Sequence, residues 1–180
     1  MNDEIQAVLD FWFAPGMEAK WFVRDADVDA EITARFAELY ERGHAGSLDD
    51  WAETRLGALA LTLVLDQFPR NLFRNSPRAF ESDQKARTLC RAILARGLDR
   101  ESTQAERQFL YLPLMHSEAL RDQRDSVAAY QALGNADALD FAIRHHDIIA
   151  AFGCFPHRNA VVGRQNTPEE TEFLKTHSGF

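Results

Sequence analysis

Four short polar segments, each set into apolar sequence, carry the residue types that could do chemistry. They lie at residues 66–74, 115–118, 145–147 and 155–159. Carboxylates, histidines and arginines are seldom placed on core-facing positions unless they have a partner or a function. The sequence therefore predicts one shared polar site, to which all four segments contribute.

Acid/base chemistry at such a site would depend on histidine, which titrates near neutral pH. His116 continues the apolar stripe of its predicted helix, and His157 lies in a loop. Asp66, which continues another apolar stripe, or Glu118 would orient the imidazole. The expected catalytic residues are therefore His116, His157, Asp66 and Glu118.

Arginines near the first segment point to an anionic ligand, because a guanidinium binds carboxylate or phosphate with two parallel hydrogen bonds. Arg70, Arg74 and Arg78 recur every four residues and would share a face if their segment were helical. His146 follows the apolar stripe of its helix, whereas His145 is expected to face away from it. The expected ligand-binding residues are Gln67, Arg70, Arg74, His146, Arg158 and Asn159.

A metal site is not expected. The sequence contains no HxH, HExxH or CxxC spacing, and the neighbouring arginines would repel a cation. It also contains no glycine-rich phosphate loop, so no particular cofactor is indicated.

Composition limits the partners and the location. The chain has 180 residues and a net charge of −8, which disfavours nucleic acid and anionic membranes. The longest nearly apolar run, residues 56–65, is too short to cross a bilayer. The first residues are acidic, unlike a secretory signal, and the two cysteines are far apart, so we expect free thiols in the cytoplasm.

Helical periodicity dominates, and we expect one all-α domain over residues 1–180. Three antiparallel pairs (27–42 with 47–67, 79–96 with 103–120, and 125–133 with 135–152) predict a compact, stacked α-α superhelix. Ser47 is the expected cap of the third helix, which should end before Pro69. Residues 69–78 and 152–166 are then the longest loops, a common place for function.

Several blocks of this chain resemble a bacterial family known only as domain of unknown function 924. They read FWF at 11–13, KWF at 20–22, LDQFPRN at 65–71, PLMHSE at 113–118, DQ at 122–123 and FGCFPHRN at 152–159. The resemblance runs from about residue 8 to residue 174. It implies an all-helical fold similar to tetratricopeptide-repeat superhelices and no established activity. The family usually has arginine where this chain has Cys154, which could alter ligand binding.

Three hypotheses for the polar segments follow. The first is a small-molecule binder or enzyme whose Arg/His/Asp pocket takes a small anionic ligand, a phosphate or a carboxylate. The second is a helical-repeat module that binds a peptide or protein partner along a concave surface. The third is a buried ion network that only holds helix ends together.

Overall fold

The computed structural model describes residues 2–177 and 179, and these form helices and connecting segments without a strand. None of the described helices is long and apolar enough to cross a membrane. The α-helices are α1 (Asp3–Trp12), α2 (Ala26–His44), α3 (Arg55–Thr62), α4 (Phe68–Leu72), α5 (Asp83–Arg96), α6 (Gln104–Met115), α7 (Leu120–Leu133), α8 (Ala136–Phe152), α9 (Asn159–Val162) and α10 (Pro168–Leu174). A π-helical segment, η3 (Leu63–Gln67), joins α3 to α4, and 3₁₀ turns span Met17–Ala19, Asp49–Glu53, Pro77–Phe80 and Pro156–Arg158.

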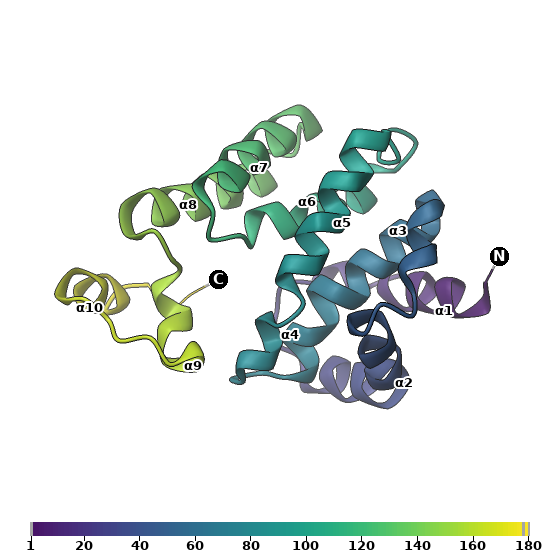
Figure 1. Ribbon diagram of the computed structural model, residues 1–180, viewed down its shortest axis with the longest axis horizontal. Helices are drawn as coiled ribbons and strands as arrows, with labels where there is room; N and C mark the ends of the chain where they lie inside the picture. Colours follow the sequence, from purple (N-terminus) through teal and green to yellow (C-terminus); the bar gives the residue numbers. More distant parts are fainter. Residues whose placement is uncertain (1, 178, 180) are drawn as a thin grey trace.

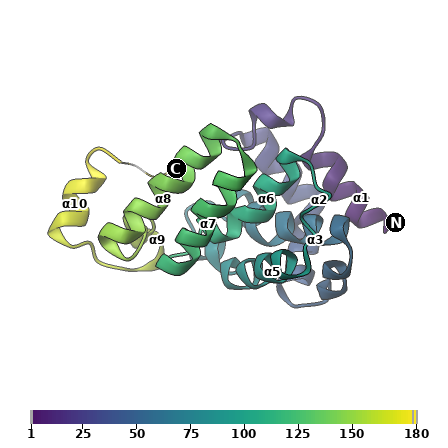
Figure 2. The same ribbon diagram turned by 90° about the horizontal axis from the view of Figure 1, so that it is seen from above.

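Consecutive helices pack side by side, as the predicted all-α fold requires. Helix α5 packs on α6, α6 on α7, and α7 on α8, while α2 packs against η3 and α4. Figures 1 and 2 show these helices following one another along the molecule, with α1 and α10 at opposite ends. The expected pairing of consecutive helices is therefore confirmed. A single domain over residues 1–180 stays a prediction.

Aromatic rings fill the core between the first helices. Trp12 packs edge-on against Phe109 with ring centroids 5.5 Å apart, and Phe36 stacks on Phe68 at 4.9 Å. All four rings are buried. Aromatic pairs of this kind add about 0.5–1.5 kcal/mol to the free energy gained by burial. Trp12 also contacts Phe68, with ring centroids 5.8 Å apart, so the four rings connect α1, α2, α4 and α6.

Helix ends follow local sequence signals in most places. Capping boxes are present at Thr103, before α6, and at Thr167, before α10. The cap expected at Ser47 is wrong, because residues 49–53 form a 3₁₀ turn and Thr54 instead accepts a hydrogen bond from the Gly57 N–H at the start of α3. A Cβ on Gly57 would clash with the Trp51 carbonyl oxygen, so glycine permits this close turn.

Pro69 does not end the third helix, contrary to expectation. Residues Leu63–Gln67 widen into a π-helix, and the Phe68 N–H donates to the carbonyl of Leu63, five residues back. Pro69 then lies in the first turn of α4, where its missing N–H is tolerated. The helix continues to Leu72, so the loop expected from residue 69 begins later. Local π-helical turns are rare and frequently mark functional sites.

Candidate functional site

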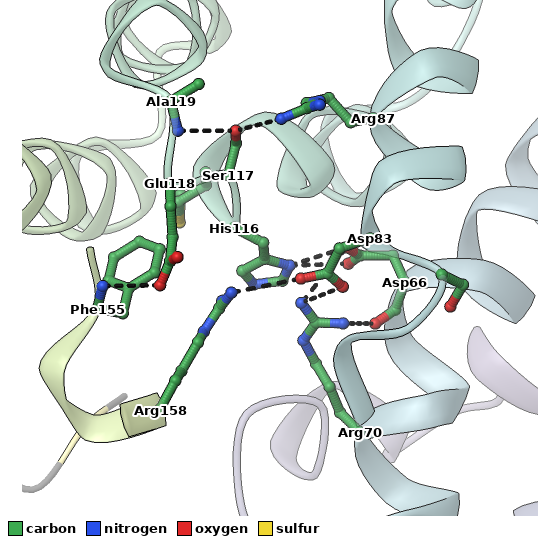
Figure 3. A network of polar contacts seen from close by, with 12 residues as sticks. Asp66, Arg70, Asp83, Arg87, His116, Ser117, Glu118, Ala119, Phe155 and Arg158 are labelled. Atoms are coloured by element: carbon green, nitrogen blue, oxygen red, sulfur yellow. Dashed lines mark hydrogen bonds and ion pairs between the residues drawn. The ribbon is translucent and has the colours of Figure 1, made fainter. Parts of the chain in front are cut away.

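The π-helical segment places one carboxylate inside the protein. Asp66 is 1% exposed, and both of its carboxylate oxygens lie close to His116 Nδ1, at 2.9 and 3.0 Å. Gln67 Nε2 donates to the same carboxylate at 2.5 Å. Arg70 donates to the Asp66 backbone carbonyl and has a guanidinium nitrogen 3.8 Å from Oδ1. Figure 3 shows Asp66 and His116 facing each other from neighbouring segments.

The contacts around this pair determine its protonation. Burial would raise the pKa of Asp66, but the positive charges of protonated His116 and of Arg70, together with the hydrogen bonds from His116 and Gln67, lower it to about 2. Burial and Arg70 together lower the pKa of His116 below its usual value. An ionised Asp66 can only accept, so the neutral His116 carries its hydrogen on Nδ1. Its Nε2, which has no hydrogen-bond partner among the described residues, is then a free base.

A second carboxylate, Asp83, bridges two arginines beside this pair (Figure 3). Arg70 donates to Asp83 Oδ1 at 3.0 Å, and Arg158 lies 3.4 Å from Oδ2. The bridge brings together residues 66–70 and the segment that follows α8. Sequence reasoning missed Asp83, because an acid in the first turn of a helix is ordinary and nothing local distinguishes it.

Arg158 is the least compensated charge of the site. The residue is 8% exposed, and its guanidinium carbon lies 4.6 Å from the ring centroid of Phe80 and 4.5 Å from that of Phe155. The long contact to Asp83 is its only ion pair among the described residues, and Nε has no hydrogen-bond partner there. Burial and the nearby Arg70 lower the pKa of Arg158 to about 10. A buried cation held by one long ion pair, which Asp83 shares with Arg70, is only partly compensated.

Glu118 holds the Arg158 segment against the turn between α6 and α7. Its carboxylate accepts from the Phe155 N–H at 2.9 Å and from two nitrogens of Arg164 at 2.6 and 2.7 Å. Burial would raise the pKa of Glu118, but these donors outweigh it and lower the pKa. With both oxygens occupied, Glu118 is placed to position the chain rather than to transfer a proton.

Ser117, next to His116, also has a positioning role. Its hydroxyl donates to buried Asp122 at 2.7 Å and accepts from Arg87 at 3.0 Å and from the Ala119 N–H at 3.1 Å. Both lone pairs of the hydroxyl oxygen are therefore occupied, which argues against Ser117 as a nucleophile. The hydroxyl instead holds Arg87 at the edge of the site.

These groups surround a cleft of about 310 Å³. Helix α5, the α6–α7 turn and the chain from residue 155 to residue 164 contribute its walls, and the π-helical segment lies behind His116. The lining residues are Phe80, Asp83, Gln84, Arg87, His116, Ser117, Glu118, Arg158, Val162 and Arg164. The cleft is within the size range of small-molecule sites.

Comparisons with known proteins give a family but no activity. The sequence matches the model described as "Bacterial protein of unknown function (DUF924)" over residues 8–178. The chain belongs to the DUF924 family. The solved structure of ATU0120, a protein of unknown function from Agrobacterium tumefaciens, is similar, with 37% identity and a TM-score of 0.91 over 96% of this chain and 97% of that one. No curated protein matches.

Arg70 and Arg74, which were expected to share a helix face, are separated in this DUF924 protein. Helix α4 ends at Leu72, so Arg74 and Arg70 do not share a face. Arg74 donates to Asp29 at 2.5 and 2.7 Å, and Arg78 pairs with Glu41. Arg74 is thus not a cleft residue, since its guanidinium binds α2 instead.

The histidine pair of α8 is arranged opposite to the prediction. His145 is 5% exposed, and its ring lies 6.3 Å from that of His116, whereas His146 is half-buried and contacts Asp147 at 3.0 Å. The stripe assigned to His146 is therefore wrong, because α8 turns Phe141 and Ile143 outward. Sequence reasoning missed His145 as a neighbour of the site.

The residues of the last predicted polar segment, 155–159, lie in two different parts of the structure. Arg158 reaches the cleft, but His157 borders a separate cavity of about 390 Å³ between α8 and α10. Asn159 is buried and donates to Asn166 at 2.8 Å and to Glu170 at 3.1 Å. These contacts attach α10 to the rest of the DUF924 fold, so the Asn159 side chain has a structural role.

Cys154 belongs to this same attachment. Its Sγ lies 3.1 Å from a Glu170 carboxylate oxygen, and burial together with Glu170 raises the pKa of the thiol to about 11. Cys154 does not line the cleft. The Cys154 side chain therefore contacts Glu170 and does not reach the cleft. Within residues 2–177 and 179, no group of three or more metal-ligating side chains gathers.

Buried His145 predicts a stability change at mildly acidic pH. Burial lowers the pKa of His145 from 6.5 to about 3, so below pH 6.5 the unfolded chain binds a proton that the folded chain does not. The contribution of neutral His145 to the free energy of unfolding is complete above pH 6.5. As the pH falls towards 3, this contribution is lost at up to about 1.4 kcal/mol per pH unit. We expect urea unfolding of His145→Gln to show a shallower pH slope. His146→Gln should retain the parental slope, and equal slopes for both variants would contradict the prediction.

Proposed function

We propose that this protein binds a small anionic molecule in the cleft and that His116 acts on it as a general base. The observation that supports this proposal most is a buried Arg158 with a single long ion pair among the described residues. It lies beside a neutral His116 whose Nδ1–H donates to Asp66. Arg158 would bind the anionic group. Arg70 and Asp83 would hold Arg158 and Asp66 in place.

The electrostatics support proton transfer at His116. A buried carboxylate that accepts the Nδ1–H orients the ring and stabilises the imidazolium once Nε2 has taken a proton. Burial and the nearby Arg70 both lower the pKa of His116, which favours the neutral histidine before the ligand arrives. This combination suits removal of a proton from a bound molecule.

The size and lining of the cleft favour a small molecule over a peptide. Charged side chains dominate its walls, and its volume of about 310 Å³ is at the low end for ligand sites. A module that binds peptides would present a longer apolar groove. We place the activity in the cytoplasm, in keeping with the free thiols Cys90 and Cys154.

Metabolite profiling tests the proposal. The purified protein and its His116→Gln variant would be incubated with a bacterial metabolite extract, and compounds consumed or retained would be measured by mass spectrometry. The amide introduced by His116→Gln can still donate to Asp66, so the fold should be kept. We expect a carboxylated or phosphorylated compound to be consumed by the parent and retained without conversion by the variant.

His146→Gln is the matched control, because His146 lies away from the cleft. It should behave as the parent. Identical profiles for the parent and His116→Gln would overturn the role of His116. Absence of any retained or consumed anion would overturn the site as a whole.

A further inference from the structure

We propose that the reaction at the cleft is hydrolysis, and that the proton which His116 removes is that of a water molecule attacking an ester bond of the bound anion. This inference rests on the proposed function and names the reaction and the substrate class of the same site. Three features of the described lining carry it, namely a single available proton acceptor, the lack of a nucleophilic side chain beside it, and a donor on Arg158 that no other residue occupies.

His116 is the one described lining residue whose proton-accepting atom is unoccupied. Its Nδ1 donates to Asp66, which leaves Nε2 as the acceptor. The two carboxylates of the lining, Asp83 and Glu118, already accept hydrogen bonds from arginines with both of their oxygens. A reaction in the cleft must therefore begin and end its proton transfers at one imidazole.

Apart from His116, the described lining offers no free nucleophile. It contains no cysteine, threonine, tyrosine or lysine, and its one hydroxyl, that of Ser117, is fully hydrogen-bonded. The attacking atom must then come from a second molecule. Water is at hand, because the His116 side chain is 15% exposed at the wall of the cleft.

The basicity of His116 suits attack by water on an ester. Burial and Arg70 lower the pKa of His116, so the neutral ring is a weaker base than an ordinary imidazole and its protonated form is a stronger acid. Removal of a proton from carbon needs a strong base. An acidic imidazolium, by contrast, readily protonates the leaving oxygen of an ester, and Asp66 stabilises that imidazolium while it exists.

Arg158 keeps a donor for the negative charge that develops during such an attack. Its Nη1 lies 3.4 Å from Asp83 and its Nε is fully covered, but Nη2 has no described partner and keeps some exposed surface. Figure 3 shows the end of this side chain directed towards His116. A fixed N–H donor at a partly desolvated site stabilises an oxyanion that forms next to the base.

The other lining arginines are engaged elsewhere. Arg87 pairs with Asp122 at 3.3 Å and donates to Ser117 and Gln84 through its two terminal nitrogens. Both terminal nitrogens of Arg164 donate to Glu118. Within the described lining, Nη2 of Arg158 is therefore the terminal guanidinium nitrogen left for a substrate.

The proposed reaction adds one water across the ester bond. Water gives a proton to Nε2 of His116 while its oxygen bonds to the carbonyl carbon or the phosphorus of the ester. The bond to the leaving oxygen then breaks, and the imidazolium returns the proton to that oxygen. No electrons are gained or lost, and both side chains end in their starting state. The substrate class is a small ester whose anionic group Arg158 holds beside the base.

Labelling with heavy oxygen tests the reaction. The purified protein and its His116→Gln variant would be incubated with a deproteinised bacterial metabolite extract in water enriched in heavy oxygen, and the products would be measured by mass spectrometry. We expect the parent to release a phosphate or a carboxylate that carries one heavy oxygen, and the labelled group identifies the ester. Its formation should be at least about a hundredfold slower with His116→Gln.

Two further variants show that the labelling comes from the cleft. Arg158→Lys keeps the positive charge but removes the Nη2 donor, and it should slow labelling at least about tenfold. His146→Gln, outside the cleft, should label as fast as the parent. Equal labelling by the parent and either cleft variant would overturn the inference.

The remaining outcomes separate this inference from the proposed function. A compound that is consumed without heavy oxygen in any product, or retained without conversion, would overturn hydrolysis and leave the anion site standing. Uptake of deuterium at carbon in a parallel incubation in heavy water, without labelled product, would assign His116 to a carbon acid and also overturn hydrolysis. If no anion is consumed or retained, the proposed function fails as well.

Discussion

Asp66→Asn is expected to lower the free energy of unfolding by about 3–5 kcal/mol, the usual cost of removing one partner of a buried ion pair. The carboxylate is 1% exposed and accepts hydrogen bonds from His116 and Gln67. The amide would present an N–H₂ group to at least one of these donors, and Arg70 would lose a nearby negative charge. Urea denaturation followed by circular dichroism measures the change.

An exposed ion pair provides the control for Asp66→Asn. Glu31 pairs with Arg35 at 2.7 Å, but both side chains are more than one-third exposed, so Glu31→Gln should cost less than about 1 kcal/mol. The Asp66 contribution should also fade as the pH falls from 5 towards 2, because its folded pKa is about 2 and the unfolded value is 3.8. An Asp66→Asn variant as stable as the parent would show that the carboxylate does not hold the fold together.

Arg158→Met is expected to act in the opposite direction and to stabilise the protein by about 0.5–2 kcal/mol. The guanidinium is buried with one long ion pair and an Nε without a described partner. Methionine keeps much of the volume between Phe80 and Phe155 and removes the repulsion with Arg70. Asp83 would still bind Arg70 at 3.0 Å. Because binding groups are often retained at a cost in stability, a gain here supports a ligand role for Arg158.

Arg74→Met is the matched control for Arg158→Met. Arg74 makes two short hydrogen bonds to Asp29, so its loss should destabilise the protein by about 1 kcal/mol or more. For a chain of this length each kcal/mol corresponds to about 2–4 °C in Tm. Differential scanning calorimetry shows whether each substitution raises or lowers Tm. A Tm for Arg158→Met several degrees below the parent would mean that Arg158 is a structural ion-pair residue.

Much of the fold could be predicted from local sequence. Apolar periodicity indicated the helices, and the caps at Thr103, Asn135 and Thr167 are local features, since a cap needs only neighbouring backbone N–H groups. The junction at Ser47 could not be predicted in this way. The choice between Ser47 and Thr54 depends on the close packing of Gly57 against the Trp51 carbonyl, which periodicity does not show.

The site was predicted in part. Asp66, Arg70, His116, Glu118 and Arg158 meet as expected, because each is a polar residue in an otherwise buried segment. Glu118 accepts hydrogen bonds from Phe155 and Arg164 with both oxygens, and its catalytic role stays a prediction. His157, Arg74 and His146 lie outside the cleft, as does Asn159.

The sequence by itself determined that the chain is all-helical, that its helices pair in order, and which segments carry buried polar groups. These properties follow from contacts between residues close in the chain. Only the tertiary structure decided that Asp83 bridges Arg70 and Arg158, that His145 faces inward, and that Pro69 continues a helix through a π-helical turn. Each of these depends on the distances and packing between segments up to 75 residues apart, about which local spacing carries no information.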